Sequence, residues 1–252
     1  MRVLYGVNPV RELLHAGGEG LFELWLAEGA ERPRALGELE RMARQRGAKI
    51  RTAPRPRLDR LAGSPGHQGV VAVVADYRYR ELGDLLAAAR ERGEEPLLVL
   101  LDGVEDPQNL GAVVRSAHAL GAHGVVIPRD RAAGVTPAVA KASAGAIEHC
   151  PVARVANLAR TLEQLKQEGI WSLALAQDGE RALWQVDLAG PTALVVGGEG
   201  DGVRPLVRRT CDHTARIPMA GRVGSLNVSA AAAIALYETA RQRAERALPK
   251  RA

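Results

Sequence analysis

Three glycine-rich turns between residues 192 and 233 contain the residues whose types and spacing could do chemistry. The first follows a short apolar run and places the carboxylate of Glu199 among four glycines. The second follows Ile217, and the third leads through Ser225 and Asn227 into an alanine-rich segment. Glycine at a strand end lets the backbone adopt positive φ and approach a ligand closely. We therefore expect a small-molecule site built mostly from main chain, although each turn alone could be only a tight connection.

The spacing of these glycines excludes two common nucleotide-binding motifs. A dinucleotide fold requires G-x-G-x-x-G at the start of a helix, with an acidic residue about twenty positions on. Here the run Gly198-Glu199-Gly200-Asp201-Gly202 has a different spacing and would place a negative charge against the pyrophosphate. The Gly-Lys-Ser/Thr of a P-loop is absent. A carboxylate among glycines favours a cationic or hydroxyl-rich ligand instead.

A second candidate region follows the fully apolar run Leu97–Leu101. Strand ends that lead into helix starts are where α/β proteins hold ligands. This run leads through a loop to Asn109 and into a helix that carries Arg115 among small neighbours. Small neighbours leave room for another chain or for RNA to approach. The alternative is that Arg115 is a surface charge and Asn109 only a helix cap.

The charge balance favours a polyanionic partner. The net charge is +5 and the isoelectric point about 9.6, and only four of the 34 basic residues are lysine. Arginine binds phosphate bidentately and stacks on bases, which suits RNA, although a GC-rich genome or heat adaptation would produce the same bias. The candidate RNA contacts lie in three segments that could also be solvated loops or turns: Arg55 and Arg57, His67, and Arg129 and Arg131.

Composition and length limit the remaining classes of protein. A chain of 252 residues allows one large domain or two small ones, and its 46% hydrophobic content is ample for a core. No segment resembles a signal peptide or a membrane span of about 18 apolar residues. Cys150 and Cys211 are too few for a disulfide framework or a cysteine-based metal site, and each is expected to be a small buried side chain. We predict a cytoplasmic protein with no membrane span and no metal.

The patterning predicts two domains and a linker. Residues 1–76 are expected to form a small α/β module, residues 77–95 a linker with one amphipathic helix, and residues 96–252 a larger α/β domain. In the larger domain strands alternate with helices, which predicts a mostly parallel sheet covered on both faces. The strands expected there are 97–101, 125–127, 152–155, 171–176, 193–196 and 216–217, and the helices are 110–120, 138–147, 158–168, 203–211 and 228–246.

Three motifs, in this order along the chain, resemble those of the SpoU/TrmH family of RNA ribose 2′-O-methyltransferases, which belongs to the SPOUT class. They are Asn109-x-Gly111-x-x-x-Arg115, Gly197-x-Glu199-x-x-Gly202, and Ile217-Pro218-Met219-x-Gly221 with Ser225-Leu226-Asn227-Val228-Ser229. Three further motifs resemble the branch that methylates a guanosine ribose in bacterial large-subunit rRNA, so the resemblance covers essentially the whole chain. These are Tyr5-Gly6-x-Asn8-Pro9-Val10, His67-Gln68-Gly69 and Leu101-Asp102-Gly103-Val104-x-Asp106-Pro107.

The resemblance implies a fold, a cofactor and partners. It implies a C-terminal SPOUT-type α/β domain with a parallel sheet and a deep trefoil knot, whose loops hold S-adenosyl-L-methionine. It also implies that residues 1–76 are a ribosomal-protein-like RNA-binding domain. The implied partners are large-subunit ribosomal RNA and a second copy of the chain, in an obligate homodimer with the site at its interface.

The resemblance also implies residue roles. The implied catalytic residues are Arg115, Asn109, Glu199, Ser225 and Asn227, and the implied cofactor-binding residues are Gly197, Gly198, Ile217, Met219, Gly221 and Leu226. Arg115 is the family's proposed base. Because a guanidinium stays protonated in proteins, our hypothesis is that Arg115 orients the 2′-hydroxyl and an adjacent phosphate. Gly224 departs from the family pattern, in which serine is frequent at this position.

This resemblance predicts a 23S rRNA guanosine 2′-O-methyltransferase, which methylates the ribose of a guanosine, and three other functions are its alternatives. A tRNA guanosine 2′-O-methyltransferase would keep the chemistry and change the substrate. An RNA-binding or ribosome-assembly factor without catalysis would keep only the RNA contact. A nicotinamide oxidoreductase is disfavoured by the glycine spacing.

Overall fold

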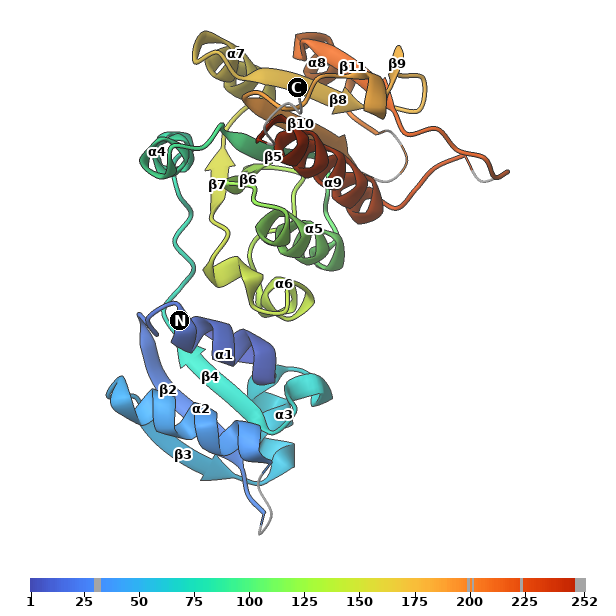
Figure 1. The fold of residues 1–252 in the computed structure, drawn as a ribbon. Helices are drawn as coiled ribbons and strands as arrows, with labels where there is room; N and C mark the ends of the chain where they lie inside the picture. Colours follow the sequence, from blue (N-terminus) through green and yellow to red (C-terminus); the bar gives the residue numbers. More distant parts are fainter. Residues whose placement is uncertain (30–32, 199, 201, 223, 248–252) are drawn as a thin grey trace. The chain divides into compact units, whose positions relative to one another are not determined.

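The computed structural model describes residues 1–29, 33–198, 200, 202–222 and 224–247, so the predicted catalytic residue Glu199 lies outside the described residues. The chain forms two compact units (Figure 1). The first comprises Met1–Arg78 and Gly134–His149, and the second comprises Tyr79–Ala133 and Cys150–Ala252. The first unit therefore includes a segment from the sequence range predicted for the larger domain.

The first unit is a small α/β fold, as the patterning predicts. Its sheet has the order β1-β4-β2-β3, with β4 antiparallel to both neighbours and β2 parallel to β3. The strand β1, which the sequence analysis did not anticipate, pairs along its full length with the apolar β4. The elements are β1 (Arg2–Tyr5), α1 (Val7–His15), β2 (Leu21–Ala27), α2 (Arg34–Gln45), β3 (Lys49–Ala53), α3 (Arg55–Ala62), η1 (Pro65–His67) and β4 (Val70–Val74).

The inserted segment Gly134–His149 packs on α1 and β1 of this unit. It contains α6 (Pro137–Ala142) and η2 (Ala146–Glu148). Arg2 forms an ion pair of 2.9 Å with Glu148, and the two side chains are only 12% and 11% exposed. Lys141 Nζ donates to Gln68 Oε1 at 3.1 Å, and partial burial lowers the pKa of Lys141. Polar contacts from α6 and η2 thus fix the segment to the N-terminal fold.

The second unit contains a seven-stranded sheet in which every pair of neighbouring strands is parallel. Its order is β7-β6-β5-β10-β8-β11-β9, which confirms the predicted parallel sheet. The threading of a trefoil knot stays a prediction. The strands are β5 (Leu97–Asp102), β6 (Gly124–Pro128), β7 (Val152–Val155), β8 (Trp171–Leu175), β9 (Arg181–Ala182), β10 (Thr192–Gly197) and β11 (His213–Arg216).

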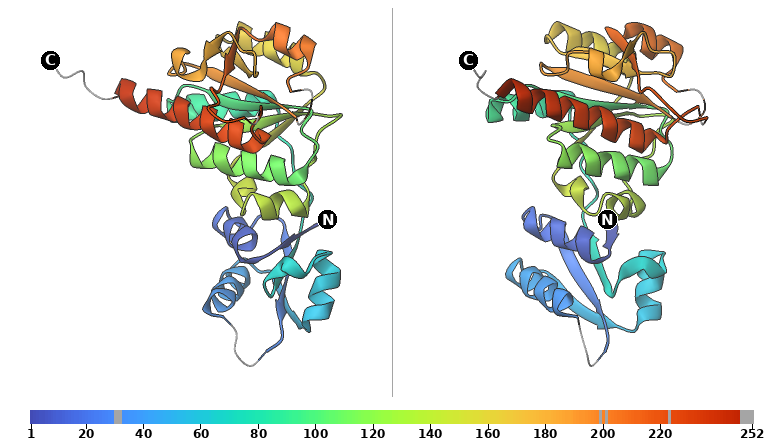
Figure 2. Two further views of the ribbon diagram at one scale, coloured as in Figure 1. Left: turned by 90° about the vertical axis from the view of Figure 1, so that its right-hand side faces the viewer. Right: turned by 45° about the vertical axis from the view of Figure 1, so that its right-hand side comes forward.

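Helices cover both faces of this sheet (Figures 1 and 2). Successive side chains of a strand point to opposite faces, and all six residues of β5 are buried, so both faces need a cover. Leu98 and Leu100 pack with α4, α7 and α8, whereas α5 and α9 lie side by side on the other face. The helices are α4 (Leu82–Arg92), α5 (Pro107–Ala119), α7 (Leu158–Gln167), α8 (Pro205–Thr210) and α9 (Val228–Ala247), with η3 (Leu183–Gln185) before β10.

The helix α4 lies in the range predicted as a linker, yet it belongs to the second unit. Leu85 and Leu86 are buried in the same apolar cluster as Leu98 and Leu100. The amphipathic pattern that predicts this helix therefore reflects packing against the sheet rather than a free connection. The first boundary between the two units along the chain falls between Arg78 and Tyr79.

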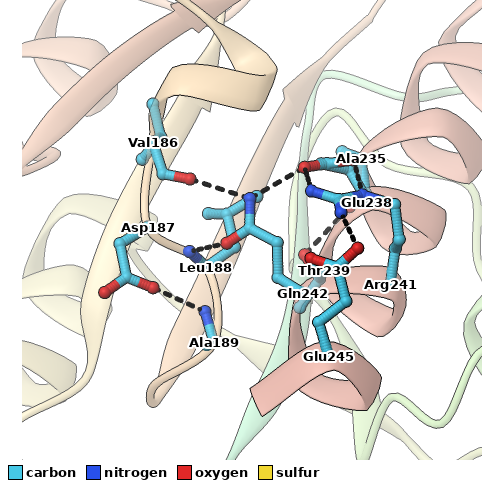
Figure 3. Close-up of polar contacts among 10 residues, drawn as sticks. All are labelled: Val186, Asp187, Leu188, Ala189, Ala235, Glu238, Thr239, Arg241, Gln242 and Glu245. Carbon is cyan, nitrogen blue, oxygen red and sulfur yellow. Dashed lines mark hydrogen bonds and ion pairs between the residues drawn. The ribbon is translucent and has the colours of Figure 1, made fainter. Parts of the chain in front are cut away.

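The C-terminal half of α9 is anchored to the connection before β10 (Figure 3). Gln242 Nε2 donates to the Val186 carbonyl at 3.0 Å, and the Leu188 amide donates to Gln242 Oε1 at 2.7 Å. Glu238 accepts hydrogen bonds from both Gln242 and Arg241. Because α9 is held at this end, the position of its N-terminus, where the third motif lies, is fixed relative to the sheet.

Two further sequence expectations concern cysteines and membranes. Cys150 is buried, and burial raises the pKa of its thiol to about 12; Cys211 is partly buried, and its pKa is likewise raised to about 12. Cys150 is therefore the small buried side chain that was expected. None of the helices in the described ranges is long and apolar enough to cross a membrane.

Candidate functional site

The carboxyl ends of β5 and β10 meet at the centre of the sheet, and the first glycine turn starts there. Gly197 is paired in register with Asp102, and the Gly198 amide donates to the Asp102 carbonyl at 2.8 Å. A Cβ atom on Gly198 would lie 2.0 Å from the Gly103 carbonyl oxygen, and one on Gly197 would lie 1.9 Å from the Gly202 carbonyl carbon. Both positions require glycine because main chain packs directly against main chain.

A buried ion pair closes this turn. The Asp102 carboxylate is 0% exposed and accepts hydrogen bonds from the Arg204 amide (2.8 Å) and Arg204 Nε (2.7 Å). The hydrogen bond to Asp102 raises the pKa of Arg204, so the guanidinium remains charged. Arg204 is also the residue that precedes α8. The pair therefore connects the end of β5 to the start of α8, and sequence reasoning, which quoted Asp102 only as part of a motif, did not predict this pairing.

The first and third motifs meet at two asparagines. Asn227 Nδ2 donates to Asn109 Oδ1 at 2.9 Å. Asn227 Oδ1 accepts from the Ser229 amide at 2.8 Å, so the same side chain caps the N-terminus of α9. Asn109, on the first turn of α5, is only 7% exposed. The structure thus brings together Asn109 and Asn227, two of the predicted catalytic residues.

A pocket of about 410 Å³ lies between the ends of β8 and β10 and the start of α9. We call it the glycine pocket, because Gly197, Gly198, Gly200, Gly202 and Gly224 contribute to its lining. Five of the six predicted cofactor residues line it, and so does Ser225; Gly221 is not among the described residues that do. The five are Gly197, Gly198, Ile217, Met219 and Leu226.

Sequence reasoning missed one wall of the glycine pocket. It is formed by the end of β8 and the residues after it, from Leu175 to Asp178. Asp178 forms an ion pair with Arg208 of α8, and the hydrogen bond from Arg208 lowers the pKa of that carboxyl. The available signal was the position of this segment after a predicted parallel strand, since ligands bind at such strand ends.

A second pocket, of about 370 Å³, adjoins the first. We call it the arginine pocket, because Arg131 and Arg204 line it together with Asn109. Gly198, Gly202 and Val228 line both pockets, so the two cavities share a wall. A reactant in each pocket would meet the other across the glycine turn and the first residue of α9. This geometry suits transfer of a small group between two bound molecules.

Arg115 is separated from this junction. It is exposed on α5, and it lies outside the sets of described residues that line the two pockets. Six residues of α-helix correspond to about 600° of rotation, so Arg115 and Asn109 point about 120° apart. The structure therefore brings Asn109 to the pockets and directs Arg115 to another face of the same helix.

The predicted RNA contacts of the first unit fall into two groups. Arg55 and Arg57 lie exposed on the helix α3, so the alternative of a solvated loop does not hold for them. The Arg57 guanidinium stacks 4.8 Å from the centroid of the Trp25 ring, and Arg51 lies 5.1 Å from the same ring. Cation–π contacts of this kind hold guanidinium groups in place while leaving their donors accessible.

His67 differs from these arginines, and its predicted direct RNA contact needs correction. Its side chain is 1% exposed, Nδ1 accepts from the Gly69 amide at 2.9 Å, and Nε2 lies 3.1 Å from Asp59 Oδ1. Both ring nitrogens are therefore engaged inside the protein. The ring fixes the turn between η1 and β4 and has no free edge for RNA.

Arg129 and Arg131 lie in the loop after β6, where the sequence predicts them. Both are exposed, but only Arg131 lines the arginine pocket. The Arg129 carbonyl accepts from Arg154, at 2.8 Å. The backbone of Arg131 has φ of 54°, a left-handed conformation that is uncommon for residues other than glycine. No group of three or more His, Cys, Asp or Glu side chains that could hold a metal ion is found among the residues described.

The fold and the two pockets define an α/β enzyme with its site at the carboxyl ends of parallel strands. The chain belongs to the SpoU rRNA Methylase family, whose model matches residues 96–237. Residues 3–80 match a second family model, described as RNA 2′-O ribose methyltransferase substrate binding. The first matched range lies within residues 96–252, and the second overlaps residues 1–76.

Individual relatives resemble the chain over nearly its full length. A TrmH-family protein of Bacillus subtilis, YacO, named as a tRNA/rRNA methyltransferase, is 48% identical over 94% of both chains. The 23S rRNA (guanosine-2′-O-)-methyltransferase RlmB of Pseudomonas syringae is 44% identical over 98% of both chains. The crystal structure of the SpoU methyltransferase AviRb from Streptomyces viridochromogenes with AdoMet superposes with a TM-score of 0.80 at 29% identity, covering 96% of this chain and 90% of that one.

Proposed function

We propose that this protein transfers a methyl group from S-adenosyl-L-methionine to the ribose 2′-oxygen of a guanosine in 23S rRNA. The observation that carries the proposal is the shared wall of the glycine and arginine pockets, beside the Asn109–Asn227 hydrogen bond. Membership of the SpoU family supports the reaction, and the name of the Pseudomonas relative supports guanosine and 23S rRNA. A ribosomal RNA substrate also implies a cytoplasmic location.

The glycine pocket fits the cofactor. Val196, Ile217 and Leu226 supply aliphatic surface for an adenine ring, and the glycines leave main-chain groups free of side chains on the remaining side. S-Adenosylmethionine supplies an electrophilic methyl group on a positively charged sulfur. Uncharged walls suit a reaction in which that charge disperses. We assign Gly197, Gly198, Ile217, Met219 and Leu226 to cofactor binding, and Gly221 to the shape of the loop that carries Met219.

The remaining residues act on the ribose and its proton. With S-adenosylmethionine bound, the bond from the 2′-oxygen to the methyl carbon would form as the carbon–sulfur bond breaks. S-adenosylhomocysteine would leave as a neutral thioether, and the hydroxyl proton would pass to solvent water. Arg115 orients the 2′-hydroxyl and an adjacent phosphate. Asn109 and Asn227 hold the two motifs in register, and Ser225 lines the glycine pocket beside them. Glu199 is proposed to order the turn that bears it.

The active form is proposed to be a homodimer. Ile234 and Tyr237 expose 40% and 63% of their surface on α9, the helix that packs beside α5, which carries Arg115. An apolar helix surface of this kind suits an isologous interface. Because Arg115 points away from the pockets of its own chain, we propose that it serves the site of the partner subunit.

Methyl transfer to defined RNAs tests the proposal. Labelled S-adenosylmethionine is incubated with protein-free large-subunit rRNA and, in parallel, with bulk tRNA. The product is then examined for one guanosine whose 3′ linkage resists alkaline cleavage, which identifies a 2′-O-methyl group. Label at one alkali-resistant rRNA guanosine is expected. Label in tRNA alone would overturn the substrate, and cofactor binding without label in either RNA or in isolated pre-ribosomal particles would overturn the activity.

A further inference from the structure

The arginine pocket is large and polar enough to hold a whole nucleoside. Its volume of about 370 Å³ falls in the range of small-molecule sites, and it lies directly behind the wall it shares with the glycine pocket. Gly198, Gly202 and Val228 line both cavities, so molecules in the two cavities would lie on opposite sides of the same few residues. A ribose in the arginine pocket would therefore lie on the acceptor side of the methyl group.

The charged side chains of the arginine pocket differ in the ion pairs and hydrogen bonds that they form within the protein. Asp102 is fully buried and neutralised by Arg204. Asp106 accepts a hydrogen bond from the Gln108 amide at 2.9 Å and so caps α5. Glu105 is exposed. Arg131 lines the cavity and forms no ion pair with any described residue. The pocket thus offers hydrogen-bond donors beside carboxylate acceptors, which suits the edge of a base better than a bare phosphate.

The backbone at Arg131 indicates that the position of its side chain is functionally important. Its φ of 54° places a non-glycine residue in the left-handed region, where glycine would be less strained. Residues held in such conformations concentrate at ligand-binding sites. The Ala133 amide donates to the Val104 carbonyl at 2.9 Å, and this bond ties the loop of Arg131 to the loop that forms the opposite side of the pocket. The loop is therefore fixed with Arg131 at the cavity.

We propose that the arginine pocket holds the target guanosine, turned out of its RNA stack, and that Arg131 donates to O6 and N7 of the guanine. A guanidinium binds these two acceptors bidentately, and no other base offers the same pair of acceptors. Extrusion of the nucleotide is required because the ribose must approach a small-molecule pocket closely. The inference rests on the proposed function and adds to it a residue that selects guanosine.

The first experiment measures the selectivity of methyl transfer for guanosine at the target position. An rRNA segment containing the mapped target is prepared with guanosine, adenosine or 7-deazaguanosine, which lacks the N7 acceptor, at that position. The wild type is expected to lose about fivefold or more in kcat/KM on 7-deazaguanosine. Arg131→Gly, which removes the side chain and relieves the left-handed strain, is expected to be slower by a similar factor on guanosine and insensitive to the 7-deaza change.

Arg129→Ala is the matched control, because it removes the same charge from the same loop outside the pocket. It is expected to retain the wild-type discrimination between guanosine and 7-deazaguanosine, while KM for RNA rises because Arg129 is itself a predicted phosphate contact. Arg131→Lys keeps the charge but not the bidentate geometry, so it should resemble Arg131→Gly in selectivity. Equal discrimination by the wild type and Arg131→Gly, with S-adenosylmethionine binding unchanged in both, would overturn the inference.

A second experiment separates this inference from the proposed function, because it needs no turnover. Guanosine and adenosine 3′-monophosphates are titrated into the protein saturated with S-adenosylhomocysteine, with binding followed by ligand-observed NMR. Wild type and Arg129→Ala should bind the guanosine nucleotide more tightly than the adenosine nucleotide, and Arg131→Gly should lose that preference. If this pattern appears without methylation of any rRNA, the proposed function fails while the assignment of Arg131 stands. If rRNA is methylated and the pattern is absent, the assignment of Arg131 is wrong.

Discussion

At the scale of the residue, Asn227 has two separable roles. Its carbonyl oxygen caps α9 through the Ser229 amide, and its amide nitrogen binds Asn109 across the site. The first role contributes to stability and the second to the relative placement of the two motifs. An N-cap can be supplied by serine, whose shorter side chain has no amide to reach Asn109. The two roles can therefore be tested apart.

Asn227→Ser is expected to retain most of the stability and to lose most of the activity. The free energy of unfolding, measured by urea denaturation, should fall by less than about 0.5 kcal/mol because serine remains a good cap. The rate of methyl transfer should fall at least about tenfold, the equivalent of one lost positioning hydrogen bond. Asn227→Ala should lose the same activity and about 1 kcal/mol of stability as well. Full activity in the serine variant would show that the contact with Asn109 has no role in catalysis.

At the scale of the element, apolar runs and helical periodicity predict most of the second unit. The runs that became β5, β6 and β10 are buried on both faces, and such continuous patterns are typical of parallel strands. The strand β1 was missed because Arg2–Tyr5 is short and mixed in character, and only its pairing with β4 makes it a strand. The sheet order was also beyond prediction, since β10 inserts between β5 and β8 through contacts distant in sequence.

In the site, too, local sequence patterns predicted some features and long-range packing determined the others. The glycines were expected to let a ligand approach, and five predicted cofactor residues do line one pocket. Composition did not reveal that Gly197 and Gly198 also permit main chain to pack on main chain. The Asp102–Arg204 pair joins residues 102 positions apart, and no local pattern indicates such a pairing. Local spacing thus identified the motifs, whereas long-range packing determined which side chains meet.

The placement of Gly134–His149 on the N-terminal fold gives a prediction for one element. Arg2→Ala leaves Glu148 nearly buried without its partner, which should lower the free energy of unfolding by about 2–3 kcal/mol. Hydrogen exchange of the amides in η2 should accelerate at the same time, because the ion pair fixes this turn to β1. The measurements are urea denaturation and exchange detected by mass spectrometry.

Two variants control for a general effect of charge. Arg44→Ala breaks an exposed pair with Glu40 on α2 and should cost about 0.5 kcal/mol or less. Arg2→Met combined with Glu148→Leu replaces the pair by apolar side chains and should recover most of the stability. Unchanged exchange in η2 after Arg2→Ala would mean that the ion pair does not hold the segment in place.

At the scale of the whole molecule, the position of Arg115 connects the proposed mechanism to the proposed homodimer. Asn109 lines the arginine pocket, whereas Arg115 leaves the same helix about 120° away and is exposed. A residue required at the reacting hydroxyl but directed away from its own pockets can act on the site of a second copy. In a symmetric dimer each site would then combine the pockets of one subunit with the Arg115 of the other.

Heterodimers test this arrangement directly. Arg115→Ala and Asn227→Ser subunits are produced together with different affinity tags, and the mixed dimer is isolated by two successive affinity steps. If Arg115 acts across the interface, one site of each mixed dimer combines intact pockets with an intact Arg115, while the other site has both defects. The mixed dimer should therefore show about half the wild-type rate of methyl transfer, although both parent homodimers are nearly inactive. If Arg115 acts within its own subunit, each site has one defect and the mixed dimer stays as inactive as its parents. A wild-type dimer with the same two tags sets the reference rate, and a chain that remains monomeric during purification would refute the shared site itself.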